Sequence, residues 1–474
     1  MTFLNFIQNG FFKKRARDLS LLPLIEEYNQ TRPAQNKQQF CKAPFSNLYF
    51  NTEGDVALCW QTFHRAEKYT EQKTLKDIWH GLNFERIREG IKNQNLDFGC
   101  TACKNHLLER NFTNILARAY DHDYPITKFP AIMEFELENT CNLACTMCNG
   151  MLSSTIRRDR EKLPPMSSPY GEKFLNELNE FIPFLHEIRF NGGEPFLIKI
   201  YERIWDKVAE LNPGLKMIVA TNGTVLNSKV KQYLERGNFH FNISIDGITK
   251  ESYEGIRVNG DFEKLMKNFI YFRDYCQNNQ RTLCIMVNPL RQNWMDLAQF
   301  VNFANEHNVA IWFNTITKPA EQALWSLPAP NLERIYKTLS DAALDPFKGG
   351  SEGLYNFNLR VYNNLVHQQI KTWWIQALEH EKSNNSFSID DDEPIKAKAE
   401  KKIYAYLIHR DEDRIMVAEK IAATAAIIDF ELADAFYQNV LATNPETLVT
   451  FCKQYSANEL KDFFLTTWLS KEKN

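Results

Sequence analysis

Three cysteines stand within the short stretch ENTCNLACTMCNG, residues 138–150. They are Cys141, Cys145 and Cys148, in the spacing C-x3-C-x2-C. Thiolates are ligands for zinc and for iron–sulfur clusters, and a closed zinc site takes four ligands. No histidine stands beside these cysteines to complete a zinc site, since His122 precedes them and His186 lies a strand further on. The ligand set therefore indicates a centre that keeps one position open.

A [4Fe–4S] cluster held by three cysteines has such a position, because one of its irons lacks a protein ligand. S-adenosylmethionine can chelate that iron through its amine and its carboxylate. The spacing, directly after an expected strand, resembles the signature of the radical SAM superfamily. The resemblance implies that one electron from the cluster cleaves S-adenosylmethionine and yields a 5′-deoxyadenosyl radical. The alternative is a set of structural cysteines in an unrelated α/β protein.

Other segments resemble the same family, in order along the chain. NGGEP, residues 191–195, resembles the GGEP motif, whose glycines let the backbone approach the ligand and whose glutamate accepts hydrogen bonds from the methionyl ammonium. In SIDG, residues 244–247, the side chains of Ser244 and Asp246 share one strand face and are expected to contact the ribose and the carboxylate. Arg257 resembles an arginine of the family that pairs with the methionyl carboxylate. The residue before the third cysteine is usually aromatic and helps to seat the adenine, and here it is Met147. The resemblance thus implies a cofactor site made of Met147, Gly192, Gly193, Glu194, Asn222, Ser244, Asp246 and Arg257.

Four more cysteines precede this region. Cys41 and Cys59 bracket a hairpin-like stretch with a glycine five residues before the second of them, and Cys100 and Cys103 form C-x2-C. The segment resembles the SPASM or twitch module of radical SAM enzymes, which implies that these four thiols hold one auxiliary [4Fe–4S] cluster. That module normally follows the barrel, whereas here it precedes it. A zinc ribbon on the same four thiols is the alternative that spacing alone favours.

The remaining three cysteines are scattered. Cys284 shares strand parity with Met286 and Asn288, so we consider it a candidate hydrogen-atom donor, with burial as a small residue as the alternative. We expect Cys276 and Cys452 to be buried thiols. Two charged segments are interpreted as solvated: the basic run at 13–17 and the acidic run at 390–392.

Composition excludes several functional classes. Hydrophobic residues make up 44% and charged residues 24% of the 474-residue chain, and the net charge of -3 predicts no general affinity for nucleic acid or for an anionic membrane. No window approaches the apolar length of a membrane span, and the basic residues of the N-terminus follow its apolar ones, the reverse of a secretory signal. We therefore expect a cytoplasmic protein, in which clustered cysteines indicate metal or redox chemistry.

Strand-like runs alternate with helical stretches in the middle of the chain. We expect strands at 131–137, 186–190, 216–222, 240–246, 282–288 and 309–315. Such alternation is typical of βα units around a parallel sheet, whose carboxyl edge carries the functional residues. We therefore predict the α/β class, with a partial (β/α)6 TIM-like barrel, preceded by a small cysteine-rich β-hairpin/helix module and followed by a helical C-terminal region.

The expected boundaries follow from these patterns and from Pro-containing or polar linkers. They are an N-terminal helix and extension at 1–40, the auxiliary cluster module at 41–125, the partial barrel at 126–320, a helical extension at 321–381 and a helical unit at 395–474.

The resemblance implies a radical SAM oxidoreductase of the SPASM/twitch type. Relatives with this module often modify ribosomally made peptides or proteins, so we expect a peptide or protein substrate, with a reductant such as flavodoxin or ferredoxin. One alternative is a small-molecule radical SAM dehydrogenase or carbon-skeleton enzyme. Another is a non-catalytic iron–sulfur electron-transfer protein, which would not need a cofactor pocket. The sequence does not indicate the oligomeric state.

Overall fold

A computed structural model describes most of the chain. The described residues are 21–32, 39–60, 62, 66–108, 110, 112, 115–316, 319–385, 395–406, 411–428, 432–443 and 445–465. The basic run at 13–17, the acidic run at 390–392 and residues 1–20 of the expected N-terminal helix lie outside them. Two compact units are distinguished, one holding residues 1–327 and 331–371 and the other holding 328–330 and 372–474. Each is described separately.

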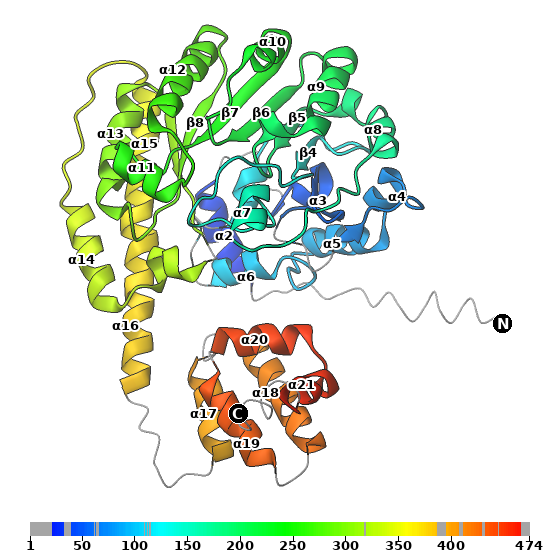
Figure 1. Cartoon of the computed structure of the whole chain (residues 1–474), viewed down its shortest axis with the longest axis vertical. Helices are drawn as coiled ribbons and strands as arrows, with labels where there is room; N and C mark the ends of the chain where they lie inside the picture. Colours follow the sequence, from blue (N-terminus) through cyan, green and yellow to red (C-terminus); the bar gives the residue numbers. More distant parts are fainter. Residues whose placement is uncertain are drawn as a thin grey trace, which may run out of the picture. The chain divides into compact units, whose positions relative to one another are not determined.

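Six consecutive parallel strands form the barrel of the first unit (Figure 1). They are β4 (Ile132–Phe135), β5 (Glu187–Phe190), β6 (Lys216–Thr221), β7 (Asn238–Ser244), β8 (Leu283–Val287) and β9 (Ala310–Phe313). All six expected strands are confirmed. β8 and β9 are apolar throughout, as expected for a sheet whose two faces are both covered, whereas β4 and β5 carry charged residues among the apolar ones.

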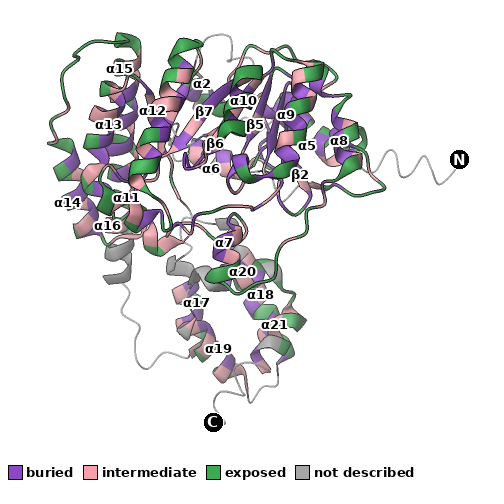
Figure 2. Cartoon of the chain, turned by 45° about the horizontal axis from the view of Figure 1, so that its top comes forward, coloured by how far each residue is buried: buried purple, intermediate pink, exposed green. Residues whose placement is uncertain are grey.

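Helices connect the strands and cover the outside of the sheet. They are α7 (Ser154–Asp159), α8 (Glu172–Leu178), α9 (Lys199–Leu211), α10 (Ser228–Arg236), α11 (Lys250–Ile256), α12 (Phe262–Asn278) and α13 (Leu297–Glu306). Several begin at a polar side chain that accepts a backbone N–H of the first turn; these caps are Ser153, Asn227, Thr249 and Asp261. Figure 2 shows the strands largely buried and the helices exposed on their outer faces.

The cysteine-rich segment adds three strands to the same sheet. They are β1 (Asn47–Phe50), β2 (Asp55–Ala57) and β3 (Glu67–Lys68), and the strand order is β3-β2-β1-β4-β5-β6-β7-β8-β9. β1 and β2 form the expected hairpin, with Gly54 at φ +85°, a backbone conformation that favours glycine. β1 pairs in parallel with β4, so the auxiliary segment and the barrel share one continuous sheet.

Short helices complete this segment. They are α2 (Leu22–Gln30), α3 (Ala43–Ser46), α4 (Leu75–Trp79), α5 (Leu82–Lys92), α6 (Thr101–Leu108) and the 3-10 helix η5 (Leu116–Tyr120). An aromatic side chain anchors α4, because Trp79 is buried and donates its indole N–H to the Lys128 carbonyl at 2.9 Å.

The remaining helices follow β9. They are α14 (Ala329–Ser340), α15 (Glu352–Asn364), the π-helix η11 (Leu365–Ile370), α16 (Lys371–Asn385), α17 (Ile395–Tyr406), α18 (Asp411–Ile427), α19 (Ala433–Ala442), α20 (Pro445–Gln454) and α21 (Ala457–Phe463). The last five pack around an apolar core of their own that includes Val417, Phe436 and Phe464. The helical C-terminal region is thus confirmed. Among the described residues, no helix combines the length and the apolar character needed to cross a membrane.

Candidate active site

The three-cysteine loop follows β4 at the carboxyl edge of the sheet. Its backbone is fixed against the end of α11, because Ala144 N–H donates to the Val258 carbonyl and Thr146 N–H to the Ile256 carbonyl, both at 2.9 Å. These paired bonds resemble a short ladder between the loop and the segment that carries Arg257.

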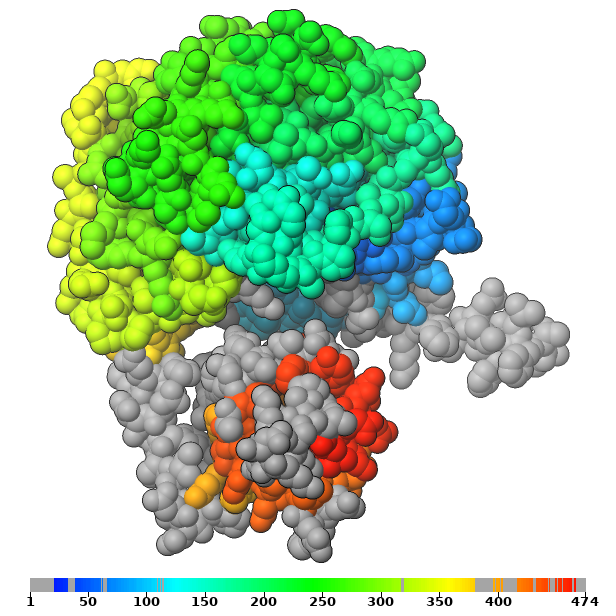
Figure 3. Space-filling model, in the orientation of Figure 1, coloured from blue at the N-terminus to red at the C-terminus, as the bar shows by residue number. Residues whose placement is uncertain are grey.

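The helix α7 holds the loop from the other side. Thr155 Oγ1 donates to the carbonyl of Cys141 at 2.7 Å, and Ser153 Oγ donates to the carbonyl of Leu143 at 2.7 Å. In Figure 3 the segment around α7 lies on the surface that faces the viewer. The loop is therefore positioned by backbone and hydroxyl contacts, and its thiols are left for other partners.

The three thiols lie close enough to influence one another electrostatically. Burial, with smaller contributions from neighbouring thiolates, raises the pKa of Cys141 to about 11 and that of Cys148 to about 12. Burial also raises the pKa of Cys145, which the Arg257 guanidinium opposes. Bound iron would reverse this balance, because a metal deprotonates a coordinating thiol. Three neighbouring thiols, of which Cys145 is buried and Cys141 and Cys148 are half-buried, are a donor set that fits an iron–sulfur centre.

Two N–H groups point at these sulfur atoms. Arg257 Nη1 lies 3.9 Å from Cys145 Sγ, and Asn222 Nδ2 lies 4.0 Å from Cys141 Sγ. Hydrogen bonds to ligand sulfurs are one way in which proteins tune the potential of an iron–sulfur cluster.

The two glycines after β5 pack directly on the cysteine loop. A Cβ at Gly193 would lie 2.1 Å from the carbonyl oxygen of Thr140, and one at Gly192, where φ is +85°, would lie 2.7 Å from that of Glu138. The N–H of Glu194 donates to the same Thr140 carbonyl at 2.7 Å. Only glycine allows this approach, so the structure brings the GGEP segment and the cysteine loop together.

Glu194 is fully buried between β5 and β6. Its carboxylate accepts hydrogen bonds from Thr221 Oγ1 at 2.8 Å, Asn222 N–H at 2.8 Å and Phe196 N–H at 3.2 Å. Burial raises its pKa to about 7, although these hydrogen bonds lower it. The carboxylate thus fixes the end of β6, and its expected contact with a methionyl ammonium stays a prediction.

Asp246 has a different environment from the one its strand parity indicated. It is fully buried and accepts from Arg257, at 2.8 Å from Nε and 2.5 Å from Nη2. It also accepts the backbone N–H of Asn288 at 2.6 Å. Its carboxylate therefore orients the Arg257 guanidinium towards Cys145, and a direct contact with a ribose stays a prediction.

The other expected cofactor residues lie around the same edge. Asn222 donates to Asn142 Oδ1 at 3.0 Å and accepts the Thr224 hydroxyl at 2.7 Å, so it links β6 to the cysteine loop. Ser244 ends β7 and is half-buried, and Met147 is half-buried in the loop itself. All eight expected cofactor residues thus stand in the cysteine loop or at the carboxyl ends of β5, β6 and β7, Arg257 by way of α11.

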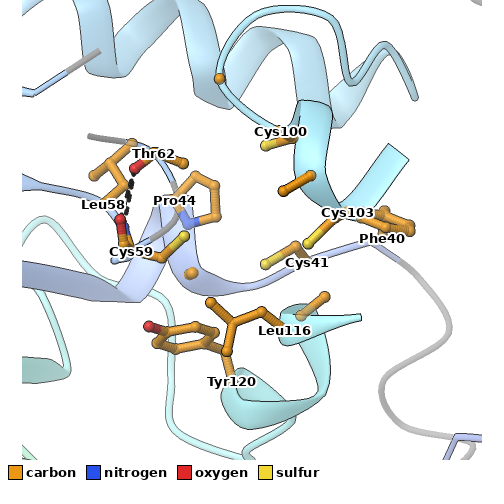
Figure 4. Close-up of a pocket in the computed structure, with 14 residues that line it drawn as sticks. Phe40, Cys41, Pro44, Leu58, Cys59, Thr62, Cys100, Cys103, Leu116 and Tyr120 are labelled. Carbon is orange, nitrogen blue, oxygen red and sulfur yellow. Dashed lines mark hydrogen bonds between the residues drawn. The ribbon is translucent and has the colours of Figure 1, made fainter. Parts of the chain in front are cut away.

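The four upstream cysteines line one cavity. Figure 4 shows the sulfur atoms of Cys41, Cys59, Cys100 and Cys103 directed towards a common centre. Apolar groups complete the lining, and Thr62 holds Cys59 by donating to its carbonyl at 2.9 Å.

The donor set of this cavity fits an iron–sulfur cluster. Burial raises the pKa of Cys41, and the other three thiols raise it further. Burial likewise raises the pKa of Cys103, while backbone N–H groups of Ala117 and Leu116 lower it by bonding to the sulfur. Among the described residues, no three His, Cys, Asp or Glu side chains are arranged to hold a single metal ion. Thiols placed around a cavity suit a cluster, which is bulkier than a zinc ion.

The two groups of cysteines lie at opposite ends of the strands. Cys41 precedes α3 and β1, and Cys59 follows β2, which runs antiparallel to β1; both therefore lie where β1 and β4 begin. Cys141 instead lies beyond the end of β4. The four-residue strand between the two ends is roughly 13 Å long at about 3.3 Å per residue.

A cavity of about 980 Å³ lies along the inner face of the barrel. Its lining includes residues that begin three strands, Ile132, Glu187 and Lys216, and residues just beyond the ends of two, Glu136 and Asn314. We call this space the barrel cavity. It therefore extends from one end of the strands to the other.

Tyr120 lies between the barrel cavity and the four-cysteine cavity. Its ring lines the four-cysteine cavity, and its hydroxyl donates to Glu134 Oε1 at 2.6 Å. Glu134 lines the barrel cavity. One aromatic side chain thus separates the two spaces.

The three scattered cysteines lie away from both groups. Cys276 is buried in α12 and Cys452 in α20, as expected for structural thiols. Cys284 lies beside Asn242 of β7 in the sheet register and is half-buried, and burial raises its pKa to about 12. Asn242 and Met286 line the barrel cavity. A role of Cys284 as hydrogen-atom donor stays a prediction.

Sequence reasoning missed the polar lining of the barrel cavity. Glu134 lies in β4 and Glu136 just after it, two residues further on. Glu187 and Arg189, both in β5, have the same spacing. Parallel strands covered on both faces are usually apolar throughout. Charged residues at period two in the expected strands were therefore the signal that could have revealed a polar interior.

Curated relatives match part of the chain at low identity. The GTP 3′,8-cyclase of Clostridium botulinum is 20% identical over 189 residues, which cover 38% of this chain and 54% of that enzyme. The GTP 3′,8-cyclase of Chlorobaculum tepidum is 23% identical over 232 residues, covering 48% and 67%. The AdoMet-dependent heme synthase of Methanosarcina barkeri is 29% identical over 154 residues, covering 30% and 38%. The chain thus spans little more than half of the length of the first of these.

Two solved structures are similar to parts of the chain. Native anSMEcpe with bound AdoMet is 20% identical, with a TM-score of 0.34, and the match covers 44% of this chain and 59% of that one. Streptococcus suis SuiB bound to S-adenosylmethionine is 14% identical, with a TM-score of 0.34, covering 53% and 59%.

Family comparisons match both cysteine-bearing regions. Residues 136–304 match the radical SAM superfamily, and residues 41–104 match the SPASM iron–sulfur cluster-binding domain. The chain therefore carries a radical SAM domain preceded, not followed, by an iron–sulfur cluster-binding domain of the SPASM type.

Proposed function

We propose that this protein is a radical SAM oxidoreductase that modifies a peptide or protein. The observation that carries the proposal is the convergence of the three-cysteine loop, the GGEP glycines and Arg257 at one edge of the barrel, next to a large polar cavity. Parallel α/β folds bind their ligands at this edge.

The cofactors of the two domains have ligands in this chain. A radical SAM domain uses a [4Fe–4S] cluster and S-adenosylmethionine, and a SPASM domain holds auxiliary iron–sulfur clusters. Cys141, Cys145 and Cys148 would hold the first cluster, and the four upstream cysteines would hold one auxiliary cluster. When bound and reduced, cluster and S-adenosylmethionine supply a 5′-deoxyadenosyl radical that abstracts a hydrogen atom from the substrate.

The protein side chains then have binding and positioning roles. Arg257 is held by Asp246, so its position next to the cysteine loop is fixed before any ligand binds. In our proposal it binds the methionyl carboxylate through a charge-assisted hydrogen bond. Glu194 holds the end of β6 in place and contributes a carboxylate to the ammonium. The barrel cavity receives the substrate.

The chemistry of the barrel cavity supports a peptide. Its lining has five carboxyl groups, at Asp121, Asp123, Glu134, Glu136 and Glu187, against two strong bases, at Arg189 and Lys216. Both bases are ion-paired with Glu187. Among the described residues that line the cavity, no unpaired lysine or arginine is present to bind a phosphate group.

Exposed aromatic side chains in and near the cavity also suit a chain-like substrate. Trp60 lines it and is 47% exposed, and Trp312, on the same face of β9 as the lining residue Asn314, is 45% exposed. Exposed aromatic side chains at the edge of a polar cavity are typical of protein and peptide contacts.

A small-molecule substrate is the second candidate. The observation that favours it is the sequence similarity of part of the chain to GTP 3′,8-cyclases. The excess of carboxyl groups in the barrel cavity is unfavourable for a nucleoside triphosphate, because like charges repel each other in a site of low dielectric constant.

Anaerobic reconstitution tests the enzymatic part. We expect about eight irons per chain from two four-iron clusters, no stoichiometric zinc, and formation of 5′-deoxyadenosine with dithionite or with flavodoxin or ferredoxin as reductant. A Cys141→Ala variant should form none. Wild-type protein that holds iron but never cleaves S-adenosylmethionine would instead be an electron-transfer protein.

Isotope transfer tests the substrate class. Extract from cells grown in heavy water is divided into a peptide and protein fraction and a fraction of small metabolites, and each is added to the reconstituted protein. We expect deuterium in 5′-deoxyadenosine with the first fraction, and its loss after protease treatment. Transfer from the metabolite fraction alone would favour the second candidate.

A further inference from the structure

Most charged groups of the barrel cavity form one balanced network near the beginning of the strands. Arg189 Nε lies 2.6 Å from Glu187 Oε1, Lys216 Nζ lies 2.8 Å from Glu187 Oε2, and Arg189 Nη1 lies 3.4 Å from Glu134 Oε2. Two carboxylates thus face two cations, and the carboxylate of Asp121, which also lines the cavity, is paired with Arg32.

Glu136 stands outside this network. Its carboxylate accepts the Tyr49 hydroxyl at 2.7 Å, and within the described part of the chain no cation forms an ion pair with it. Burial raises its pKa to about 7, against the Tyr49 hydrogen bond, which lowers it. Glu136 is half-buried, and a carboxylate that has lost part of its water without gaining a cation is unfavourable, so a positive ligand would relieve that cost.

The position of Glu136 is close to the cofactor edge. It directly follows β4, and a Cβ built on Gly192 would lie 3.3 Å from Glu136 Cγ. Tyr49, which orients the carboxylate, belongs to β1 of the auxiliary segment. A group bound to Glu136 would therefore lie between the SPASM domain and the GGEP loop.

Uncharged hydrogen-bonding groups line the same cavity. Asn191, Asn242 and Asn314 line it, and within the described residues their side-chain amides make no hydrogen bond to the protein. Amide oxygens and a carboxylate are acceptors for ammonium and guanidinium groups.

We propose that Glu136 and the three asparagines bind a basic side chain, lysine or arginine, of the peptide substrate. This inference rests on the proposed function and names the residue class that the cavity selects. The carboxylate contributes a charge-assisted hydrogen bond to the cation, and the amide oxygens accept its remaining N–H groups. Tyr49 keeps one carboxylate oxygen fixed, so the other is directed to the ligand.

Four short peptides test this selection on the reconstituted wild-type protein with S-adenosylmethionine. They have the form acetyl-Gly-Ala-Xaa-Ala-Gly-amide, where Xaa is lysine, arginine, glutamine or glutamate, and their affinities are compared by calorimetry. We expect the lysine and arginine peptides to bind about tenfold or more tightly than the glutamine peptide, as for a hydrogen bond to a charged group. Equal binding of all four, no binding of any, or preference for glutamate would overturn the inference.

Two variants test whether Glu136 causes the preference for basic peptides. Glu136→Gln keeps the shape and the bond from Tyr49 but loses the charge, so the ratio of lysine to glutamine affinity should fall to about one. Glu172→Gln, at an exposed residue of α8 that pairs with Arg203, changes the net charge equally and should keep the wild-type ratio. A preference that survives in Glu136→Gln, shown to be folded by its iron content and melting temperature, would overturn the assignment.

The failure of this inference differs from the failure of the proposed function. Wild-type protein that never cleaves S-adenosylmethionine contradicts the proposed function. Protein that cleaves it, and takes deuterium from peptides without regard to basic residues, contradicts only the role of Glu136.

Discussion

Three carboxyl groups just beyond the ends of β4, β5 and β7 are stabilised in different ways. Asp246 is balanced by the Arg257 guanidinium, whereas Glu194 depends on three hydrogen bonds from uncharged groups. Glu136 has one such bond, from Tyr49. Burial raises the pKa of Glu194 and the pKa of Glu136 alike to about 7, and Glu136, with a single hydrogen bond, has the fewest protein partners to balance its charge.

Glu194→Ala should destabilise the protein before any cofactor binds. The change removes the acceptor of three buried donors, and leaving such donors unsatisfied costs about 2–4 kcal/mol. Urea unfolding of the iron-free protein measures the loss. Glu172→Ala, at an exposed residue, should stay within about 0.5 kcal/mol of wild type; equal effects of the two variants would contradict the structural role of Glu194.

Glu136 should make stability depend on pH between its unfolded and folded pKa values. Burial raises the pKa of Glu136 from 4.5 to about 7, so folding favours its protonated form. The resulting stabilisation, about 3 kcal/mol, is complete below pH 4.5 and is lost as the pH rises through 7. The free energy of unfolding of the iron-free wild-type protein, minus that of iron-free Glu136→Gln, should therefore fall as the pH rises over this range. A difference that rises with pH, or does not change, would contradict the burial of an unpaired carboxyl.

The elements of the fold follow closely from the sequence, because each depends on local patterns. Apolar runs with flanking turn residues predict β4 to β9, and Gly54 predicts the β1–β2 hairpin. Which strands lie side by side could not be predicted, since no local pattern in the sequence indicates that β1 pairs with β4.

The same limit applies to the site. Motif spacing predicts the three-cysteine loop and the GGEP segment, whose glycines meet that loop in the structure. The alternation of side chains along the strand predicts Asp246 on the face that binds the ligand. Its contact with Arg257 could not be predicted, because that contact depends on where α11 ends. The Tyr49–Glu136 pair joins two strands that are far apart in the sequence, so it emerged only from the sheet.

Gly193→Ala should disrupt the loop element without affecting the auxiliary segment. The new methyl group would lie 2.1 Å from the Thr140 carbonyl, so the backbone of the cysteine loop must move. We expect the iron content of the reconstituted protein to fall from about eight to about four per chain, with no cleavage of S-adenosylmethionine. Gly255→Ala, where nothing lies within 4 Å, is the matched control and should keep both properties. Full iron content in Gly193→Ala would show that the loop tolerates the shift.

At the scale of the molecule, one sheet unites the auxiliary segment with the barrel. β1 pairs with β4 over four residues, and Tyr120 of the auxiliary segment bonds to Glu134 of the barrel. The helices α17 to α21 instead have a separate apolar core. Stability should therefore divide between the two units, and not between the auxiliary segment and the barrel.

Cys59→Ala tests this division. Losing one of four ligands should release the auxiliary cluster, and metal binding contributes directly to folding free energy. Because β2 and β1 continue into the barrel sheet, we expect the main calorimetric transition of the reconstituted protein to fall by about 5–10 °C as a single peak. The transition of the C-terminal helices should stay at its wild-type temperature. A barrel transition that keeps its temperature while a third, smaller peak appears would mean that the auxiliary segment unfolds by itself, and that the shared sheet does not couple it to the barrel.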